Sequence, residues 1–511
     1  MSMQKKEKII NVRPAFVACL SLVCGIFCAY RSFLHTPFIN LIAYILCALF
    51  IGSLCFFKGY LRKRLAVIVC IASVFFFIGN VSSNYCINKA KNLPYHEQYG
   101  QFSGRIYEIT SYESGYLIYF DECEIEGKKL HSKAVLFLYD DEVEHYIDVG
   151  AKIAFNARIN NRIKSGSKEG EVFGGVYYEL EDASKVQIID FQADFFEIVY
   201  LNARTFLKQN LSKEGAGIAL ALLLGDTSMF NKFKLDNYRM AGIAHIFAVS
   251  GLHVGLMVGI FTYLAKCLKI KRKLRPLFIL IPAFIYCGVC GFRPSSLRAF
   301  IMATVVIFSN HFGFKKDNLS SCSIAGIILL LINPFNLMDY GFKLSFMAVT
   351  SIFLLKPLLT RQSRGLKWFG EPLSLSLSAQ IGTLPILTQM SGYTSIIAIF
   401  TNLIFVPVTA FLHTFIFVCF ILSSITSSFI AGAVKIMTVC DLLISSVDLL
   451  ISNIDFSLFA IPTTLGGFSV IWYIAMFAVS DYLNLSSKQK LILCITSVVC
   501  VFGGSLLVSL I

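Results

Sequence analysis

Long apolar runs occupy most of the chain, and one extended polar segment interrupts them. Phe278–Val289, Ile324–Ile332 and Ile396–Ile425 contain no Asp, Glu, Lys or Arg. About 20 apolar residues cross the hydrocarbon core as a helix, and only helices or closed barrels satisfy the backbone there. The runs lack the two-residue alternation of a membrane barrel. They predict a polytopic α-helical membrane protein with about 13 spans, three of them near 15–33, 37–57 and 65–83 and the others after about residue 242.

The polar segment from 84 to 192 has a different pattern. Five stretches rich in Ile, Val, Tyr and Phe alternate with Gly and charged residues, which is typical of strands: Gln101–Thr110, Gly115–Glu122, Lys133–Tyr139, Ala151–Ile159 and Val176–Ile189. Five strands of this length predict a small OB-like β-barrel. An amphipathic pattern follows at 193–213, with Phe195 and Ile198 against Arg204 and Lys208. It predicts a helix lying in the membrane interface. The predicted domains are therefore 1–83, 84–192, 193–213 and 214–511.

Composition agrees with this assignment and narrows the chemistry. The chain is 56% hydrophobic and 15% charged, with mean hydropathy +0.69, whereas soluble domains carry about 25% charged residues. No cleavage site follows the basic N-terminus, so we expect an uncleaved first span. Most of the 16 cysteines lie in apolar runs and are expected to pack as small hydrophobes. A disulfide between Cys86 and Cys123 stays open, and no zinc-ligand spacing occurs.

The net charge of +14 mostly reflects topology. With a cytoplasmic N-terminus, the inner loops hold 22 Lys and Arg residues and the short outer turns four. This orientation places the polar segment outside the cytoplasmic membrane. Residues 89–192 contain 12 Lys and Arg residues against 18 Asp and Glu residues, a net charge of −6. Single strands can stack on exposed aromatics of such barrels. The candidate aromatics are Tyr116, Tyr119, Tyr139, Tyr177 and Tyr178. These residues are equally ordinary strand formers, and the acidic net charge of the segment counts against DNA binding.

Residues 217–260 concentrate ionisable groups within apolar sequence. A short apolar stretch ends at Gly225-Asp226, a polar piece runs to Arg239, and a long predicted helix then carries His245, Ser250, Gly251 and His253. Polar groups inside a span usually face a cavity or the bundle interior. The two histidines, eight residues apart, would lie about 80° apart around that helix. They are candidates to line a passage, or they are packing histidines. Ser250 beside a histidine suggests nucleophilic catalysis, but no acidic partner has helical spacing.

Several stretches, taken in their order along the chain, resemble sequence motifs of the ComEC family of competence proteins. They are LLLGD (222–226), AHIFAVSGLHVGL (244–256), GFRPSSLRAFIMA (291–303), NPFNLMDYGFKLSFMAV (333–349), SAQIGTLPIL (378–387) and TNLIFVPV (401–408). The order of spans, barrel and second block of spans is similar as well. The resemblance implies that 214–511 is a competence-type channel domain for single-stranded DNA. It also implies a surface DNA receptor and a cytoplasmic DNA motor as partners. Many members end in a metallo-β-lactamase-like domain. The sequence has no such metal motif, so we expect a short form without it.

The remaining candidates are polar groups near predicted helix ends. Arg293 and Arg298 are expected either to snorkel to the interface or to contact phosphate through their guanidinium forks. Gln380 is a candidate for a polar lining. Asp226 and Arg239 either pair with each other or shape an outer mouth.

Three functional hypotheses follow. The first is a channel for single-stranded DNA during natural transformation. The second is a membrane hydrolase, which would need a carboxylate or metal cluster. The third is a secondary transporter, which would show internal repeats. No nuclease or ATP-binding motif occurs, so we expect no enzymatic activity, no metal and no cofactor. The expected partners are DNA and the lipid bilayer, and the sequence leaves open whether a homo-oligomer encloses the pore.

Overall fold

The structure is a computed structural model that divides into two compact units. Unit 1 comprises Met1–Ile87, Phe314–Ile399 and Ala460–Ile511, and unit 2 comprises Asn88–Gly313 and Phe400–Phe459. The structure describes residues 13–34, 59–112, 115–130, 132–139, 148–162, 176–191, 193–230, 232–313, 317–362, 369–395, 397–425, 460–462, 469–480 and 489.

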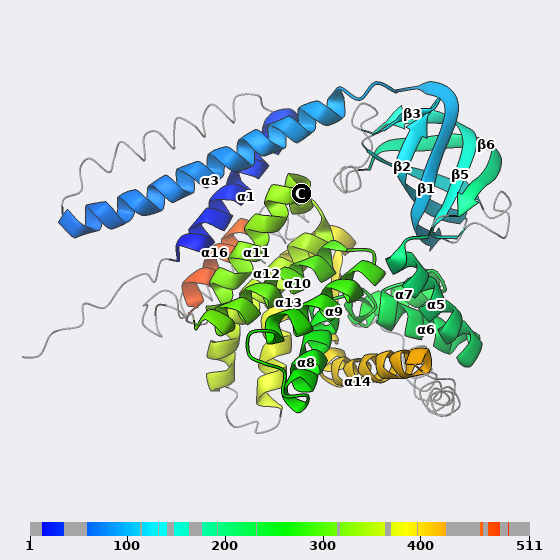
Figure 1. Ribbon diagram of the computed structural model, residues 1–511. Helices are drawn as coiled ribbons and strands as arrows, with labels where there is room; N and C mark the ends of the chain where they lie inside the picture. Colours follow the sequence, from blue (N-terminus) through cyan, green and yellow to red (C-terminus); the bar gives the residue numbers. More distant parts are fainter. Residues whose placement is uncertain are drawn as a thin grey trace, which may run out of the picture. The chain divides into compact units, whose positions relative to one another are not determined.

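Unit 1 is built from apolar helices (Figure 1). They are α1 (Pro14–Leu34), most of α3 (Gly59–Lys91), α11 (Asn318–Ile332), α12 (Tyr340–Gln362), α13 (Gly370–Ser391) and α16 (Ser469–Val479), with the 3₁₀ turn η4 (Pro334–Leu337) and the short strands β7 (Tyr393–Ser395) and β8 (Ala460–Pro462). Helices α1 and α3 cross at glycines. A Cβ at Gly25 would overlap the Phe76 carbonyl oxygen, and one at Gly79 would lie 2.5 Å from the Leu22 carbonyl oxygen. Small residues allow this close approach of two backbones.

A proline in α13 explains one polar contact of unit 1. Pro385 has no N–H, so the Ile381 carbonyl one turn earlier loses its helical partner. The indole Nε1 of Trp472 on α16 donates to that carbonyl at 2.9 Å. The carbonyl freed by this proline therefore joins α13 to α16.

Unit 2 contains the predicted barrel, with strands β1 (Gln98–Tyr112), β2 (Gly115–Ile125), β3 (Lys128–Lys129), β4 (Lys133–Tyr139), β5 (Ala151–Asn161) and β6 (Val176–Phe191). The sheet runs β1-β5-β6-β4-β2, and β2 pairs again with β1, which closes five strands into a barrel. The β4–β6 pair is parallel and the other pairs are antiparallel. All five predicted strands are present, so the predicted small β-barrel is confirmed, in an arrangement consistent with an OB-like fold.

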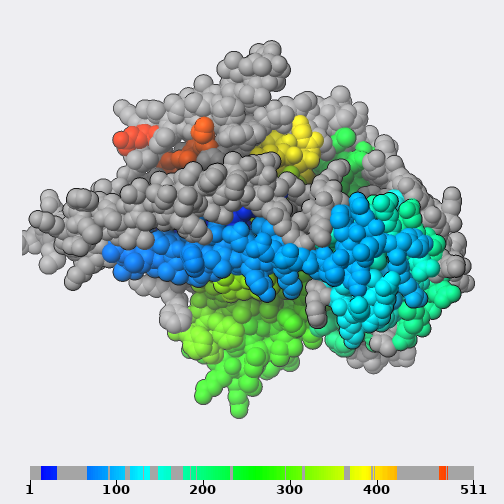
Figure 2. All heavy atoms as spheres, turned by 90° about the horizontal axis from the view of Figure 1, so that it is seen from above, coloured from blue at the N-terminus to red at the C-terminus, as the bar shows by residue number. Residues whose placement is uncertain are grey.

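Side chains fill the barrel. Phe102, Phe120, Phe155 and Tyr178 are among its fully buried core residues. In Figure 2 the cyan and teal spheres form a rounded lobe. Cys123 is a buried free thiol of this core, so the disulfide between Cys86 and Cys123 is absent. Because Tyr178 is buried, it is not a surface on which a base could stack.

Helices form the remainder of unit 2: α5 (Phe195–Asn210), α6 (Lys213–Leu224), α7 (Lys232–Met240), the 3₁₀ turn η3 (Ala244–Ile246), α8 (Gly251–Cys267), α9 (Arg275–Val289), α10 (Pro294–Phe312) and most of α14 (Ala398–Ile425). The helix predicted at 193–213 is confirmed as α5. Its N-terminus is fixed by a capping box in which Asp194 accepts from the Glu197 N–H and Glu197 accepts from the Asp194 N–H.

Three described helices are long and apolar enough to cross a membrane: Ala66–Lys89, Tyr340–Arg361 and Ala398–Leu422. Shorter apolar helices occur at Pro14–Tyr30, Gly251–Cys267, Arg275–Val289 and Asn318–Ile332. The predicted spans near 15–33 and 65–83 coincide with α1 and α3, and the one at 37–57 lies outside the described residues. The total of about 13 spans, the membrane orientation and the residue boundaries of the four domains stay predictions.

Candidate functional site

The short helix α6 lies buried in unit 2 and ends at the LLLGD stretch. Residues 215–224 are all buried, and at 12 residues α6 is too short to span, as predicted. Gly225 ends it with a φ of 71°, in the left-handed region that glycine adopts readily. A side chain there would also meet a methyl of Val249 at 2.7 Å. Glycine is therefore required both by the turn and by the neighbouring chain.

Side chains from three other helices satisfy the carbonyls at the end of α6. The last carbonyls of a helix have no partner within it. Tyr286 of α9 donates its hydroxyl to the Leu223 carbonyl at 2.9 Å, and Arg293 donates to the Gly225 carbonyl at 2.6 Å. His413 of α14 lies with Nδ1 3.1 Å from the Leu222 carbonyl. This contact places the ring proton on Nδ1. The end of α6 is thus a cluster of polar contacts inside an apolar helical region. We call this cluster the polar joint; it comprises Tyr286, Arg293, His413 and the carbonyls that they contact.

The start of α8 forms a second part of this joint, and it corrects the sequence prediction. His245 does not share a helix with Ser250 and His253, because it lies in η3 and the chain turns before α8 begins at Gly251. Ser250 is the N-cap residue. Its hydroxyl accepts from the Leu252 N–H at 3.3 Å, which stabilises a helix start there rather than a continuous helix. The prediction that the two histidines lie on one helix is therefore wrong.

His253 completes the cap from inside the helix. The Ser250 N–H donates to His253 Nδ1 at 3.0 Å, so the proton of this neutral ring lies on Nε2. The His253 and His413 rings are 4.6 Å apart between centroids, edge to face. Both side chains are buried, and His413 Nε2 has no hydrogen-bond partner among the described residues. The ring contact brings α8 and α14 together at a pair of neutral imidazoles.

Removing the Ser250 hydroxyl tests the capping role. We expect Ser250→Ala to destabilise the protein by about 1 kcal/mol, the usual cost of losing an N-cap. Ser250→Thr keeps the hydroxyl and should recover most of the loss. The measurement is the thermal unfolding midpoint of the purified protein in detergent. An alanine variant as stable as the parent would show that this hydroxyl does not cap α8.

The two arginines lie at the start of α10 and in its first turns. Arg293 is the N-cap residue of α10, with Pro294 in the first turn, and Ser295 donates its hydroxyl to the Val249 carbonyl at 2.5 Å. Arg298, one turn further on, is 2% exposed. Its burial contradicts the prediction that it snorkels to the membrane interface. The guanidinium instead lies inside the packed helices of unit 2.

Asp226 and Arg239 do not form the predicted pair. Asp226 accepts from the Tyr200 hydroxyl at 2.7 Å and from the Ser228 N–H at 2.9 Å. Arg239 pairs with Asp236 in its own helix at 2.8 Å. Of the two predicted mouth residues, only Asp226 lines the pocket described next.

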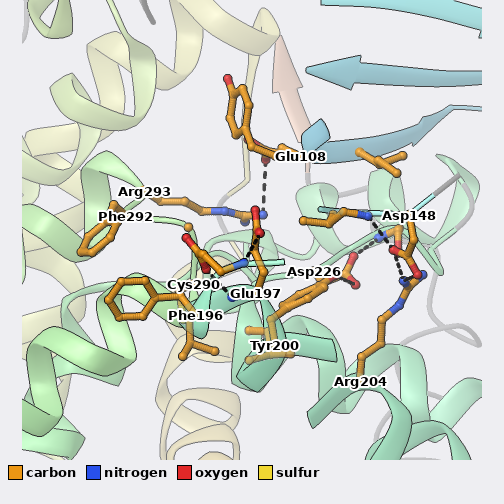
Figure 3. A pocket seen from close by; sticks show the side chains of 18 of the residues that line it. Glu108, Asp148, Phe196, Glu197, Tyr200, Arg204, Asp226, Cys290, Phe292 and Arg293 are labelled. Carbon is orange, nitrogen blue, oxygen red and sulfur yellow. Dashed lines mark hydrogen bonds and ion pairs between the residues drawn. The ribbon is translucent and has the colours of Figure 1, made fainter. Parts of the chain in front are cut away.

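A polar pocket of about 840 Å³ lies within unit 2, between the barrel and helices α5, α6, α9 and α10 (Figure 3). Three guanidiniums cross it in ion pairs. Arg105 of β1 binds Glu197 of α5 at 3.1 Å and Asp121 of β2 at 3.0 Å. The other two join α5 and α10 to the barrel side: Arg204–Asp148 at 2.7 Å and Arg293–Glu108 at 3.3 Å. These ion pairs tie the barrel to the helices.

Burial shapes the protonation of these groups. Desolvation raises the pKa of Glu197 above its ordinary value, although the Asp194 N–H and Arg105 partly oppose this. Burial lowers the pKa of Lys133, whose ammonium lies 3.9 Å from the centre of the Tyr107 ring. Burial also acts on Asp226, but hydrogen bonds from Ser228 and Tyr200 outweigh it, so its pKa lies below its ordinary value. The lining holds six carboxylates against four basic side chains.

The other candidates are distributed around the chain. Gly251 begins α8, and a side chain there would meet only the Ala299 methyl at 3.8 Å, so packing does not require glycine. Gln380 lies half-buried within α13 of unit 1.

The sequence interpretation missed Tyr200, Tyr286 and His413. Of these, His413 had a signal, since it is the one histidine in the apolar run Ile396–Ile425. Among the described residues, no cluster of His, Cys, Asp and Glu could hold a metal ion.

Comparison with known proteins places these motifs in a family. Residues 222–484, just over half of the chain, match the family described as Competence protein. ComE operon protein 3 of Bacillus subtilis is 31% identical over 207 residues, which cover 40% of this chain and 26% of the relative. Recombination protein 2 of Haemophilus influenzae is 28% identical over 145 residues, which cover 27% of this chain and 18% of the relative.

A third relative is similar over a longer stretch. An uncharacterized protein of Aquifex aeolicus is 26% identical over 320 residues, which cover 59% of this chain and 71% of that protein. The chain thus spans only about a quarter or less of the two named relatives. No solved structure matches the chain. The polar joint lies within the matched region, at the end of α6, the start of α8, the α9–α10 turn and α14. The chain belongs to the competence protein family.

Proposed function

We propose that this protein passes single-stranded DNA across the cytoplasmic membrane during natural transformation. The observation that carries the proposal is the match to the competence protein family over residues 222–484. The two named relatives support it, since one is named as the third protein of the ComE operon and the other is named for recombination.

Buried polar groups within apolar helices supply the physical support. Arg298, His253 and His413 are each 2% exposed or less, in α10, α8 and α14. Ionisable groups at such depth are costly and typically mark a pathway for ions or polar solutes. Few positive groups suit a polyanion, because a strongly basic lining would hold the strand instead of releasing it.

The orientation belongs to the same proposal. The N-terminus faces the cytoplasm and the barrel faces the outside, as the distribution of Lys and Arg predicts. A surface DNA receptor then delivers the strand to the barrel side. A cytoplasmic motor pulls it, as the membership of the competence protein family implies. In this scheme the chain is a conduit and catalyses no reaction.

A gene deletion tests the proposed function. Cells without the gene should bind labelled DNA at their surface as well as the parent, while label entering the cytosol falls to background. A plasmid copy of the gene should restore uptake. Undiminished entry of DNA in the deletion strain would refute the proposal.

A further inference from the structure

The end of β6 and the start of α5 expose a continuous apolar edge, formed by Ile188, Ile189, Phe191, Phe195 and Ile198. Each of these side chains is between 49% and 61% exposed. Exposed apolar patches of this density mark contact with a partner or a membrane. A register shift in the β5–β6 pairing leaves Ile189 as an extra residue beside Ile188, so this strand end departs from regular alternation.

The exposed face of α5 changes character along its length. Phe195 and Ile198 lie one turn apart in the N-terminal half, and the exposed positions that continue this face are polar: Asn202, Thr205 and Gln209. The opposite side carries Glu197 and Arg204, which bind the barrel side across the pocket. The helix therefore presents apolar surface only at its N-terminal end.

Contacts with α9 fix the position of that end. Phe196 packs against Gly288 so closely that a Cβ there would overlap its ring. Its ring also lies 6.5 Å from that of Phe284, which is exposed on α9 together with Leu277 and Ile281. Gly288 is next to the last residue of α9, an apolar helix with an exposed apolar face suited to lipid. The start of α5 thus lies beside the C-terminal end of α9.

From these placements we infer that the β6–α5 apolar edge inserts into the membrane interface, with the N-terminal half of α5 deeper than its C-terminal half. Its partner is the lipid bilayer, because the edge continues the exposed apolar surface of α9. The acidic groups of the edge are engaged locally: Asp190 accepts from the Phe191 N–H, and Asp194 and Glu197 form the capping box. No cluster of basic residues accompanies the described edge. Insertion therefore rests on apolar burial and requires no anionic lipid.

Depth-dependent fluorescence quenching tests this inference. Tryptophan is placed in the full chain at Phe195→Trp and, separately, at Ile189→Trp, with Thr205→Trp on the polar half of α5 and Lys129→Trp on β3 as controls. Each protein is reconstituted in phosphatidylcholine vesicles containing lipid brominated near the headgroup. The signal of the parent protein, which has two tryptophans, is subtracted. We expect emission from the two edge positions to fall about twofold more than from either control, since interfacial side chains contact the upper acyl chains.

Two further measurements decide between lipid and other occupants. Adding phosphatidylglycerol should leave the quenching unchanged. Quenching at both edge positions no stronger than at Thr205→Trp would overturn the inference. So would a dimer of the parent protein that dissociates when Ile189→Asp and Phe195→Asp are combined, because a second copy would then cover the edge. DNA uptake does not enter the readout, so this result is independent of the proposed function.

Discussion

Gly25→Leu is expected to leave little folded protein in the membrane. A Cβ at this position overlaps the backbone carbonyl of Phe76, and the reciprocal contact of Gly79 with the Leu22 carbonyl leaves α1 and α3 no room to shift. Overpacking costs about 1–3 kcal/mol where side chains can move, and occasionally more. Here the added side chain meets a backbone carbonyl that cannot rotate away, so we expect the free energy of unfolding to fall by about 3 kcal/mol or more. The two helices would have to separate, which would also break the bond from Asn80 to the Gly25 carbonyl.

The matched control is Gly255→Leu in α8, where nothing lies within 4 Å of the added Cβ. Protein in the membrane fraction and the thermal unfolding midpoint after purification are the measurements. Gly25→Ala should fall between the parent and the leucine variant. Equal yield and midpoint for Gly25→Leu and Gly255→Leu would contradict the close crossing of α1 and α3.

Arg105→Met is expected to be the most damaging substitution in the polar pocket. It removes the cation between Asp121 and Glu197 while leaving both carboxylates in place. Removing one partner of a buried pair costs about 3–5 kcal/mol. The Arg105 side chain is 17% exposed and that of Glu197 12%, so we expect a loss near the lower end of that range. Combining Arg105→Met with Glu197→Gln should recover part of the stability, because one stranded charge is then removed.

The control for this experiment is Arg239→Met. Its pair with Asp236 is largely exposed and is expected to contribute about 0–1 kcal/mol. Chemical unfolding of the purified proteins, followed by tyrosine and tryptophan fluorescence, compares them. If Arg105→Met is as mild as Arg239→Met, the ion pairs do not hold the barrel to the helices.

The sequence predicted those elements whose pattern is local. All five strands and helix α5 follow from alternation and amphipathicity within about ten residues. The prediction of a long helix through His245 was wrong. Ser250 is the N-cap of a new helix inside an apolar run, and hydropathy does not reveal such a helix start. The family motifs located the joint at the end of α6. Their function as helix ends and turns became visible only when α6, α8, α9 and α10 were placed together.

Contacts distant in sequence were beyond prediction. Arg293 was identified as a candidate phosphate ligand, but its partner Glu108 lies 185 residues earlier, and Glu197 lies 92 residues after Arg105. Likewise, nothing local to His413 indicates that it meets His253 or the Leu222 carbonyl. Charge composition alone could not separate groups that bind each other from groups available to DNA.

The central claim is that this chain itself provides the passage for DNA, and reconstitution tests it most directly. The purified protein is placed in vesicles that enclose a single-strand-binding protein as a trap. Labelled single-stranded DNA is added outside, followed by nuclease. The account predicts label protected inside these vesicles well above empty vesicles, and much less protection with Arg298→Leu. Protection no greater than in empty vesicles, from protein shown to be folded and inserted in both orientations, would contradict it.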